Sequence, residues 1–330
     1  MAEPGWIAGT ARGPGGSRDF KLWVPASLEK GQDAPLVVVL HGCTHDAKNM
    51  AEISGLNELA ETNCFLAVYP EQSRLANLMK CWNWFNPKHQ ARDAGEPSIL
   101  AAVVEQVCSS HRVDRDRVYL VGVSAGGAMA SILAATYPEL FAALAIFAGA
   151  EYKAATSISE GLAAMTQGGP DPVRQGQLAF EAMRVGLARK PRRRMPVIVF
   201  HGTADNRVSL VNADQAIAQW SKTNVCLAAE FSENGFVLTE KVIDAQVPDG
   251  HAFRRHIYVE ADGHLLLEKW IVQGLGHAWS GSPKPSKYGD PKGPNASLEI
   301  WRFFCEAGSI PSASLSRQDS LQQPSRGTST

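Results

Sequence analysis

Short apolar runs alternate with amphipathic segments along most of the chain. Five of these runs consist mainly of aliphatic and β-branched residues without a polar face, as expected of strands that are buried on both sides. They span residues 34–42, 64–70, 117–122, 142–149 and 195–202. The segments between them carry apolar residues at helical spacing, and Pro97 suits the first turn of one such helix. Strands that alternate with helices predict an α/β sandwich with a mainly parallel central sheet.

Further strands and a helix are predicted on either side of this alternating pattern. Residues 19–25 read as an edge strand. Residues 241–247 and 256–272 read as strands, the second folded into a hairpin at Asp262–Gly263. A helix is predicted over 295–308.

The two ends of the chain are expected to lie outside the folded domain. Residues 1–16 are rich in glycine and predict a loop, and residues 308–330 are poor in apolar residues and predict a disordered tail rich in Ser and Gln. No internal repeat or midway linker divides the remainder. We therefore expect a single α/β domain over 17–307.

Composition excludes several classes of function. The chain has 330 residues, 45% of them hydrophobic, and a net charge of −1, so no overall field attracts nucleic acid. The basic run at 189–194 is interpreted as a solvated loop. The sequence has no run of 18 apolar residues, so no membrane span is predicted. Six scattered cysteines without a Cys-x-x-Cys pair make a metal site unexpected, and no cofactor is predicted.

The compartment stays open at this stage. The first twenty residues lack the basic and apolar regions of a signal peptide. The protein is therefore expected either to stay in the cytoplasm or to be a mature form whose export signal is missing.

A nucleophile is predicted directly after the third apolar run. Residues 122–126 read Gly-Val-Ser-Ala-Gly, which fits the nucleophile elbow, a sharp strand-to-helix turn that exposes a serine hydroxyl. The strand before Ser124 and the helical pattern after it supply the context that the motif needs. Side chains at 122, 126 or 127 would collide with neighbouring backbone, which explains the glycines there.

A base and an acid are expected to follow the serine in the order Ser, Asp, His. Among the later histidines, His251, His256 and His264 lie in predicted strands or turns, whereas His277 follows a strand in a glycine-flanked loop. Asp205 lies just past the carboxyl end of the strand at 195–202. We therefore predict His277 as general base and Asp205 as its orienting acid, with a helix cap as the alternative role of Asp205.

The oxyanion hole is expected to consist of backbone N–H groups. One is that of Ala125, the residue after the nucleophile, and the other comes from the loop that follows the strand at 34–42. Cys43 and Thr44 are both candidates there, and the sequence does not decide between them. His41 in the same loop precedes the acid in the chain and is interpreted as structural.

The chain resembles the polyhydroxybutyrate depolymerase family of esterases, which also covers feruloyl and acetylxylan esterases. The resemblance rests on the segments LHGCTHDAKNM, CWNWF, VYLVGVSAGGAMA, VFHGTADNRV and GLGHAWSG in this order and spacing, over residues 17 to 305. It implies an α/β-hydrolase fold, a triad of Ser124, Asp205 and His277, and hydrolysis of carboxylic esters without a cofactor. Many members are exported, which favours an extracellular or periplasmic location.

The substrate is expected to be a small or oligomeric ester. Short acyl esters, 3-hydroxybutyrate oligomers and feruloyl or acetyl polysaccharide esters are all compatible with the resemblance. Trp82 and Trp279 are predicted to line the cleft, with a core role as the alternative for Trp82. An acyltransferase with the same triad and a non-catalytic module on a hydrolase fold are the competing functions.

Two cysteines flank loops that are expected at the active-site face. A disulfide between Cys43 and Cys81 is one hypothesis, and two independent thiols are the other.

Overall fold

The computed structural model describes residues 5–29, 31–187, 194–230 and 236–308. Within them, ten strands form one sheet in the order β1-β2-β4-β3-β5-β6-β7-β10-β9-β8. The strands are β1 Gly5–Gly13, β2 Gly16–Val24, β3 Ala34–Leu40, β4 Leu66–Pro70, β5 Val113–Val123, β6 Ala143–Phe147, β7 Val197–Gly202, β8 Thr239–Gln246, β9 Ala252–Val259 and β10 Leu265–Val272. The neighbours from β4 to β10 pair in parallel, and both edges are extended by antiparallel pairs. The predicted mainly parallel sheet is confirmed.

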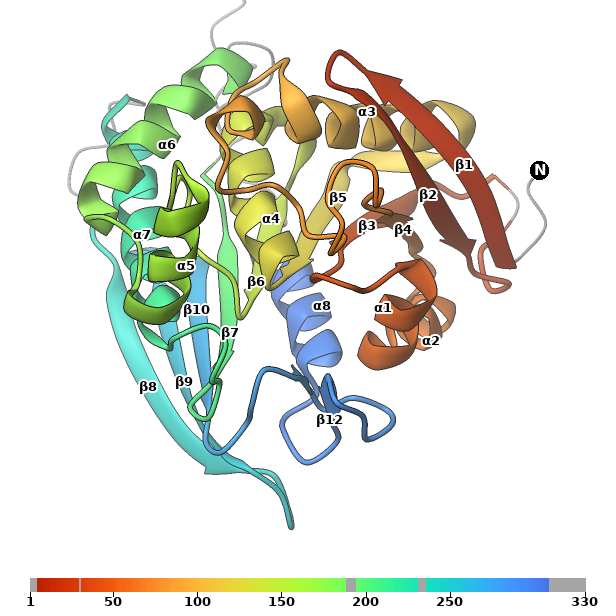
Figure 1. Ribbon diagram of the computed structural model, residues 1–330. Helices are drawn as coiled ribbons and strands as arrows, with labels where there is room; N and C mark the ends of the chain where they lie inside the picture. Colours follow the sequence, from red (N-terminus) through yellow and green to blue (C-terminus); the bar gives the residue numbers. More distant parts are fainter. Residues whose placement is uncertain (1–4, 30, 188–193, 231–235, 309–330) are drawn as a thin grey trace, which may run out of the picture.

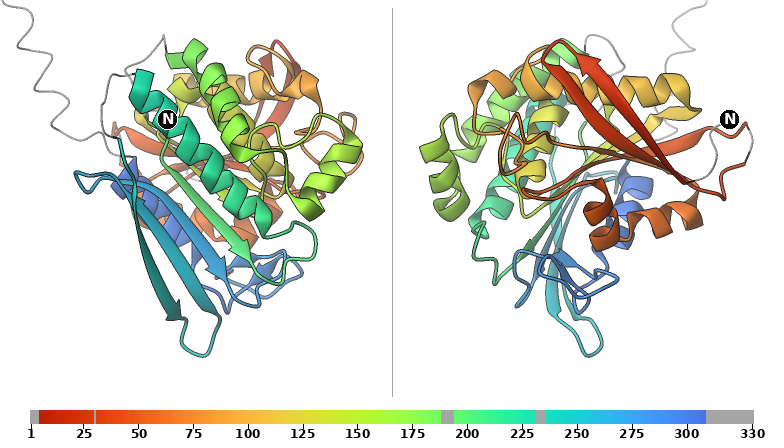
Figure 2. Two further views of the ribbon diagram at one scale, coloured as in Figure 1. Left: turned by 90° about the vertical axis from the view of Figure 1, so that its left-hand side faces the viewer. Right: turned by 45° about the vertical axis from the view of Figure 1, so that its right-hand side comes forward.

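Helices cover both faces of this sheet (Figure 1). One face packs against α3 Gly95–Ser110, α4 Ala125–Thr136, α5 Ile158–Gln167, α6 Pro172–Leu187 and α7 Val211–Glu230. The other packs against α1 Ala47–Ser54, α2 Leu56–Asn63 and α8 Ala296–Ala307. The two further views show the sheet between these helix layers, with β8 and β9 extending beyond them (Figure 2). Short 3₁₀ turns lie at Pro87–His89 and Pro138–Leu140, and β11 Trp279–Ser280 pairs with β12 Gly289–Asp290.

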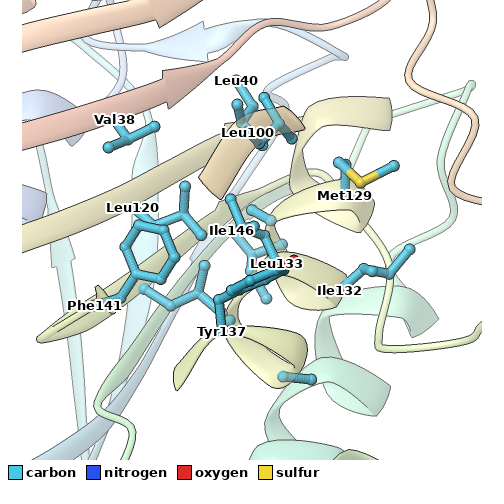
Figure 3. Packing of buried hydrophobic residues seen from close by; sticks show 14 of the residues in the cluster. Val38, Leu40, Leu100, Leu120, Met129, Ile132, Leu133, Tyr137, Phe141 and Ile146 are labelled. Atoms are coloured by element: carbon cyan, nitrogen blue, oxygen red, sulfur yellow. The ribbon is translucent and has the colours of Figure 1, made fainter. Parts of the chain in front are cut away.

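Strand residues alternate between two hydrophobic clusters, one on each face. Val38 and Leu40 of β3 belong to the cluster with α3 and α4, and Val37 and Val39 belong to the cluster with α1, α2 and α8. Figure 3 shows the first cluster, where Leu133 of α4 lies beside strand residues of the sheet. Continuous apolar runs arise here because both faces of these strands are dry.

The N-terminal segment is a strand rather than the predicted loop. Residues 5–13 pair with β2 along their whole length. Two glycines of this hairpin permit close approach: a Cβ at Gly9 in β1 would lie 2.4 Å from the Phe20 ring, and one at Gly15, in the turn between β1 and β2, would lie 2.0 Å from the Gly95 carbonyl oxygen of α3. Glycine in a strand can mark such an approach, but in the sequence alone these glycines indicate a loop.

Two sequence predictions fall on residues outside the described part of the chain. The tail at 308–330 lies there except for Gly308, and the basic run at 189–194 lies there except for Arg194. Among the helices that the structure does describe, none is long and apolar enough to cross a membrane.

Candidate active site

Ser124 occupies the sharp turn between β5 and α4. Its φ of 55° is unusual for a residue with a side chain and stores strain that the surrounding backbone must hold. The Ser124 N–H donates to the Phe147 carbonyl of β6 at 2.9 Å. A Cβ at Gly122 would lie 2.2 Å from the Gly126 carbonyl oxygen, and one at Gly126 would lie 2.2 Å from that of Leu40. These contacts give the steric reason for the two outer glycines of the motif.

The loops that carry Asp205 and His277 are joined directly to each other. Asp205 follows β7 and His277 follows β10, which is the parallel neighbour of β7. The Thr203 N–H donates to the Val272 carbonyl and the Ala204 N–H to the Leu275 carbonyl, both at 3.0 Å. Gly202 permits this approach, because a Cβ there would lie 2.1 Å from the Leu275 oxygen.

The Asp205 carboxylate binds His277 with one oxygen and its own loop with the other. His277 Nδ1 lies 2.7 Å from Asp205 Oδ2. Asp205 Oδ1 accepts the N–H groups of Arg207 and Val208, each at 2.9 Å. The carboxylate therefore orders its turn and orients the imidazole at once, but it does not cap the following helix, because α7 begins only at Val211. This arrangement leaves His277 Nε2 for a proton from the serine.

Burial and hydrogen bonding act on the Asp205 carboxyl in opposite directions. Burial alone would raise its pKa, but the hydrogen bond and charge of His277 together with the two loop N–H groups hold the pKa below its ordinary value. The neighbouring His201 is buried and donates through Nε2 to the Val208 carbonyl at 2.8 Å. Burial lowers the pKa of His201, which keeps a second positive charge away from Asp205.

The structure distinguishes the two candidate donors of the oxyanion loop. The Thr44 N–H donates to the Met79 carbonyl at 2.7 Å, so the prediction that it could serve the oxyanion is wrong. Among the described residues, the Cys43 N–H donates no such hydrogen bond. Ala125 is the first residue of α4, where the N–H has no acceptor within the helix. Cys43 and Ala125 are thus the candidate pair.

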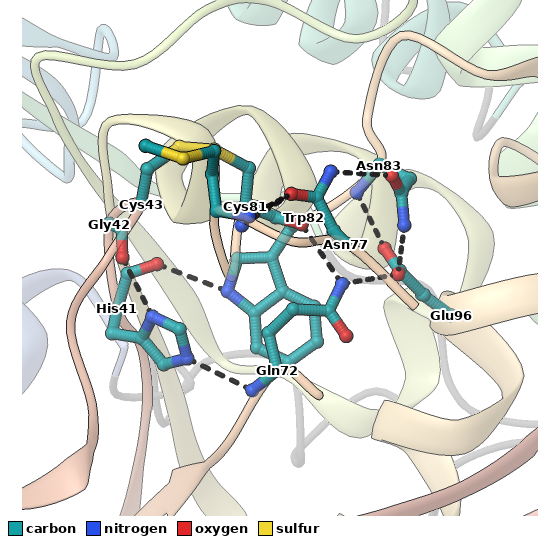
Figure 4. The surroundings of a disulfide bond; sticks show 10 residues. His41, Gly42, Cys43, Gln72, Asn77, Cys81, Trp82, Asn83 and Glu96 are labelled. Carbon is teal, nitrogen blue, oxygen red and sulfur yellow. Dashed lines mark hydrogen bonds between the residues drawn. A yellow bond between two sulfur atoms is a disulfide. The ribbon is translucent and has the colours of Figure 1, made fainter. Parts of the chain in front are cut away.

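Three contacts fix the loop that carries Cys43 (Figure 4). A disulfide joins Cys43 to Cys81, as hypothesised from the sequence. The Trp82 indole N–H donates to the His41 carbonyl at 3.0 Å. The His41 ring donates through Nδ1 to the Gly42 carbonyl and accepts the Gln72 N–H through Nε2. His41 is therefore structural, as predicted.

Buried Glu96 of α3 organises the segment on the far side of this disulfide. Its carboxylate accepts the backbone N–H and the side-chain amide of Asn83, both at 2.7 Å, and also the Gln72 amide. Arg18 pairs with it at 3.3 Å. Sequence reasoning missed this residue, because a lone Glu in the first turn of a helix usually reads as a surface residue.

The predicted tryptophans differ in their positions. Trp82 is fully buried behind the oxyanion loop and does not line the cleft, so its predicted substrate contact is wrong. Its indole N–H needed a buried acceptor, which the His41 carbonyl provides. Trp279 does lie in the cleft wall, but it stacks on Phe147 and is only 1% exposed, so little of its ring can reach a substrate.

A cleft of about 390 Å³ opens above Ser124 and His277. Its walls are largely apolar, with Met50 and Ile53 of α1, Met79 of the disulfide loop and Met165 of α5. His45, Arg207, Lys287 and Tyr288 also line it. The sequence alone does not assign these lining residues to the cleft, because loops far apart in the chain bring them together.

Comparisons with known proteins bear on the family and the fold of this chain. A family model described as esterase PHB depolymerase matches residues 19–240. The chain is 34% identical over 265 residues to a poly(3-hydroxyalkanoate) depolymerase C of Paucimonas lemoignei, which covers 80% of this chain but 59% of that protein. It is 29% identical to a feruloyl esterase B of Thermothelomyces thermophilus, over 78% of this chain and 82% of that one. An acetyl xylan esterase from Aspergillus awamori superposes with a TM-score of 0.64 at 20% identity, over 88% of this chain and 94% of that one, and shares the fold.

We predict that His41 makes stability fall on acidification. Burial lowers its pKa from 6.5 to about 4, so between these values the unfolded chain binds a proton that the folded chain does not. The free energy of unfolding should therefore drop by about 3 kcal/mol from pH 7 to pH 4 on account of this group. The measurement is urea unfolding across this range for wild type and His41→Gln, which keeps an acceptor for the Gln72 N–H. Parallel curves for the two proteins would refute the assignment.

We predict that the disulfide stabilises the fold and positions the oxyanion loop. A Cys43→Ala/Cys81→Ala variant keeps the Cys43 N–H but opens a loop with a sequence separation of 38 residues. Its free energy of unfolding should fall by about 3 kcal/mol. Its kcat should fall about tenfold, less than the 10²–10³-fold loss of a whole oxyanion donor. Cys64→Ala, which removes a free thiol, is the control. Unchanged stability and kcat in the double variant would contradict this role.

Proposed function

The chain belongs to the PHB depolymerase family of esterases, and from this premise we propose that it hydrolyses carboxylic esters through an acyl-enzyme at Ser124. The observation that carries the proposal is the hydrogen-bonded Asp205–His277 pair lining one cleft with a strained Ser124. A strained backbone at a half-buried serine that lines a cleft has no structural purpose of its own and is typical of a nucleophile.

The first half of the proposed reaction forms the acyl-enzyme. Ser124 Oγ attacks the ester carbonyl carbon while His277 Nε2 takes the hydroxyl proton. Negative charge develops on the former carbonyl oxygen, where the N–H groups of Cys43 and Ala125 stabilise it. His277 then gives the proton to the leaving alcohol, and the acyl group stays on Ser124.

The second half releases the acid. His277 takes a proton from water while the resulting hydroxide attacks the acyl carbon. When the second tetrahedral intermediate collapses, His277 gives this proton to Ser124 Oγ, and the free acid leaves. Asp205 stays ionised throughout and stabilises the imidazolium that forms in both halves. Hydrolysis is preferred to acyl transfer because the relatives are named as esterases and a depolymerase. The intact Asp205–His277 pair argues against a non-catalytic module.

The acyl group of the substrate is proposed to be short, or flat and aromatic. A cleft of about 390 Å³ lies at the small end of ligand pockets, which span about 300–1,000 Å³. Met50, Met79 and Met165 provide flexible apolar walls that suit several short acyl groups. Trp279 contributes little specific contact, since it is nearly covered.

The compartment is proposed to be oxidising. The disulfide between Cys43 and Cys81 would not persist in a reducing cytosol. This supports the extracellular or periplasmic location that the family resemblance implies over the cytoplasmic alternative.

We predict that the triad residues control turnover but not folding. Ser124→Ala should lower kcat on p-nitrophenyl butyrate by about 10⁴-fold or more, His277→Ala comparably and Asp205→Ala somewhat less. Circular dichroism and thermal unfolding check that each variant is folded. Folded Ser124→Ala protein with an unchanged rate would end the proposal.

We predict that kcat/KM is highest on acetyl to butyryl or feruloyl esters and falls about tenfold or more at dodecanoyl. Each further methylene contributes about 0.8 kcal/mol only where it is buried, and the cleft offers little room beyond a few carbons. A series of p-nitrophenyl esters with methyl ferulate measures this. Rates that rise steadily with chain length, or jump at an oil–water interface, would contradict it.

A further inference from the structure

The cleft above Ser124 carries positive charge without a matching carboxylate. Arg207 and Lys287 line it, and no Asp or Glu does. Carboxylates on the same loops bind other groups: Asp205 binds His277, Asp46 accepts the Asn49 N–H at the start of α1, and Asp290 binds His251. A cleft with one sign of charge and apolar walls concentrates ligands of the opposite sign.

Both cations lack an ionic partner within the part of the chain that the structure describes. Neither Arg207 nor Lys287 forms an ion pair there, and both side chains are exposed. Many arginines elsewhere are paired, as Arg92 is with Glu139 and Arg254 with Asp244. The two cleft cations are therefore free to receive an anion from solution.

The backbone and a ring hold these cations at the cleft. The Arg207 N–H is bound by Asp205 Oδ1, so the base of this side chain is fixed beside the acid–base pair. The Lys287 ammonium lies 5.1 Å from the centroid of the Tyr288 ring, and that ring packs edge-on against His45 at 4.6 Å. Tyr288 is tied to the cleft wall by the bond from the Trp279 N–H to its carbonyl at 2.8 Å.

The position of Arg207 indicates which part of an ester would carry the negative charge. His277 protonates the leaving alcohol in the proposed mechanism, and Arg207 lies two residues beyond the acid that binds His277. On this basis the alcohol portion is assigned to the side of the cleft that carries Arg207, and the acyl chain to the apolar walls that Met50, Met79 and Met165 form.

We propose that the cleft selects esters whose alcohol portion bears a free carboxylate, as in hydroxy-acid oligomers cleaved next to their carboxyl end, with Arg207 and Lys287 as specificity-determining residues. This inference rests on the proposed ester hydrolysis. The carboxylate lies away from the bond that breaks, so the cations lower KM and leave kcat nearly unchanged.

The test compares one substrate in two charge states. The linear dimer of 3-hydroxybutyrate as free acid and as methyl ester has the same internal ester, and its cleavage is followed by chromatography. Wild type should prefer the acid about fivefold or more in kcat/KM at about 0.01 M salt, through KM. At about 1 M salt, where screening acts over about 3 Å, the preference should fall toward parity.

Charge-removing variants assign this preference to the two residues. Arg207→Gln and Lys287→Gln should each reduce the acid preference about threefold, and the double variant should approach parity. Circular dichroism and thermal unfolding check that each variant is folded, and the ratio of its rates on the acid and on the methyl ester is the readout. Arg174→Gln, an exposed arginine on α6 outside the cleft, should leave the preference unchanged.

The failure of this inference is distinguishable from failure of the proposed function. Hydrolysis of both probes without an acid preference, or with a preference that the double variant retains, would overturn the selection of carboxylates and leave the esterase intact. If wild type cleaves p-nitrophenyl butyrate but neither dimer, the selection of carboxylates is overturned, and if it cleaves none of the three esters, the proposed hydrolysis fails. Calorimetric binding of the acid dimer to Ser124→Ala then decides charge recognition: loss of binding upon adding Arg207→Gln and Lys287→Gln sustains it, and equal binding overturns it.

Discussion

The backbone strain at Ser124 is the constraint on which the rest of the site depends. A non-glycine residue at φ 55° persists only where its surroundings determine it. Here β3, β5 and β6 hold it: the Phe147 carbonyl binds the Ser124 N–H, and Gly126 lies against the carbonyl of Leu40. The same close packing places Gly42 of the oxyanion loop beside the serine. A Cβ built at Gly42 would lie 3.4 Å from the Ser124 Cβ, at van der Waals distance.

The chemistry is distributed over loops whose supports are independent of one another. Direct backbone hydrogen bonds between the ends of β7 and β10 fix the distance between Asp205 and His277. The oxyanion loop is held by its disulfide to Cys81, by the buried indole of Trp82 and by the neutral His41 ring. Glu96 in turn anchors the segment that carries Cys81. Because these supports do not share residues, damage to the oxyanion loop should leave the acid–base pair in place.

The sequence predicts the fold and the sharp turn at Ser124 well, because periodic apolar runs and a strand–glycine–serine–glycine–helix pattern are local signals. It predicts Asp205 and His277 through the known order of such residues along the chain. It fails where the outcome depends on contacts between distant segments. The Thr44 N–H donates to the Met79 carbonyl, and the Trp82 indole donates to the His41 carbonyl. Gly9 lets β1 approach Phe20, and Gly15 lets the turn after β1 approach α3. The cations of the cleft come from segments 80 residues apart, and only Arg207 lies in one of the segments that carry the family resemblance.

The central claim is that Ser124 forms a covalent bond with the acyl group, and labelling tests it most directly. A fluorophosphonate that reacts with activated serines, followed by peptide mass spectrometry, should give one adduct per chain on the peptide containing Ser124. His277→Ala should largely prevent the labelling, since the serine then lacks its base. An adduct on a different residue, or none while esters are still hydrolysed, would contradict the account.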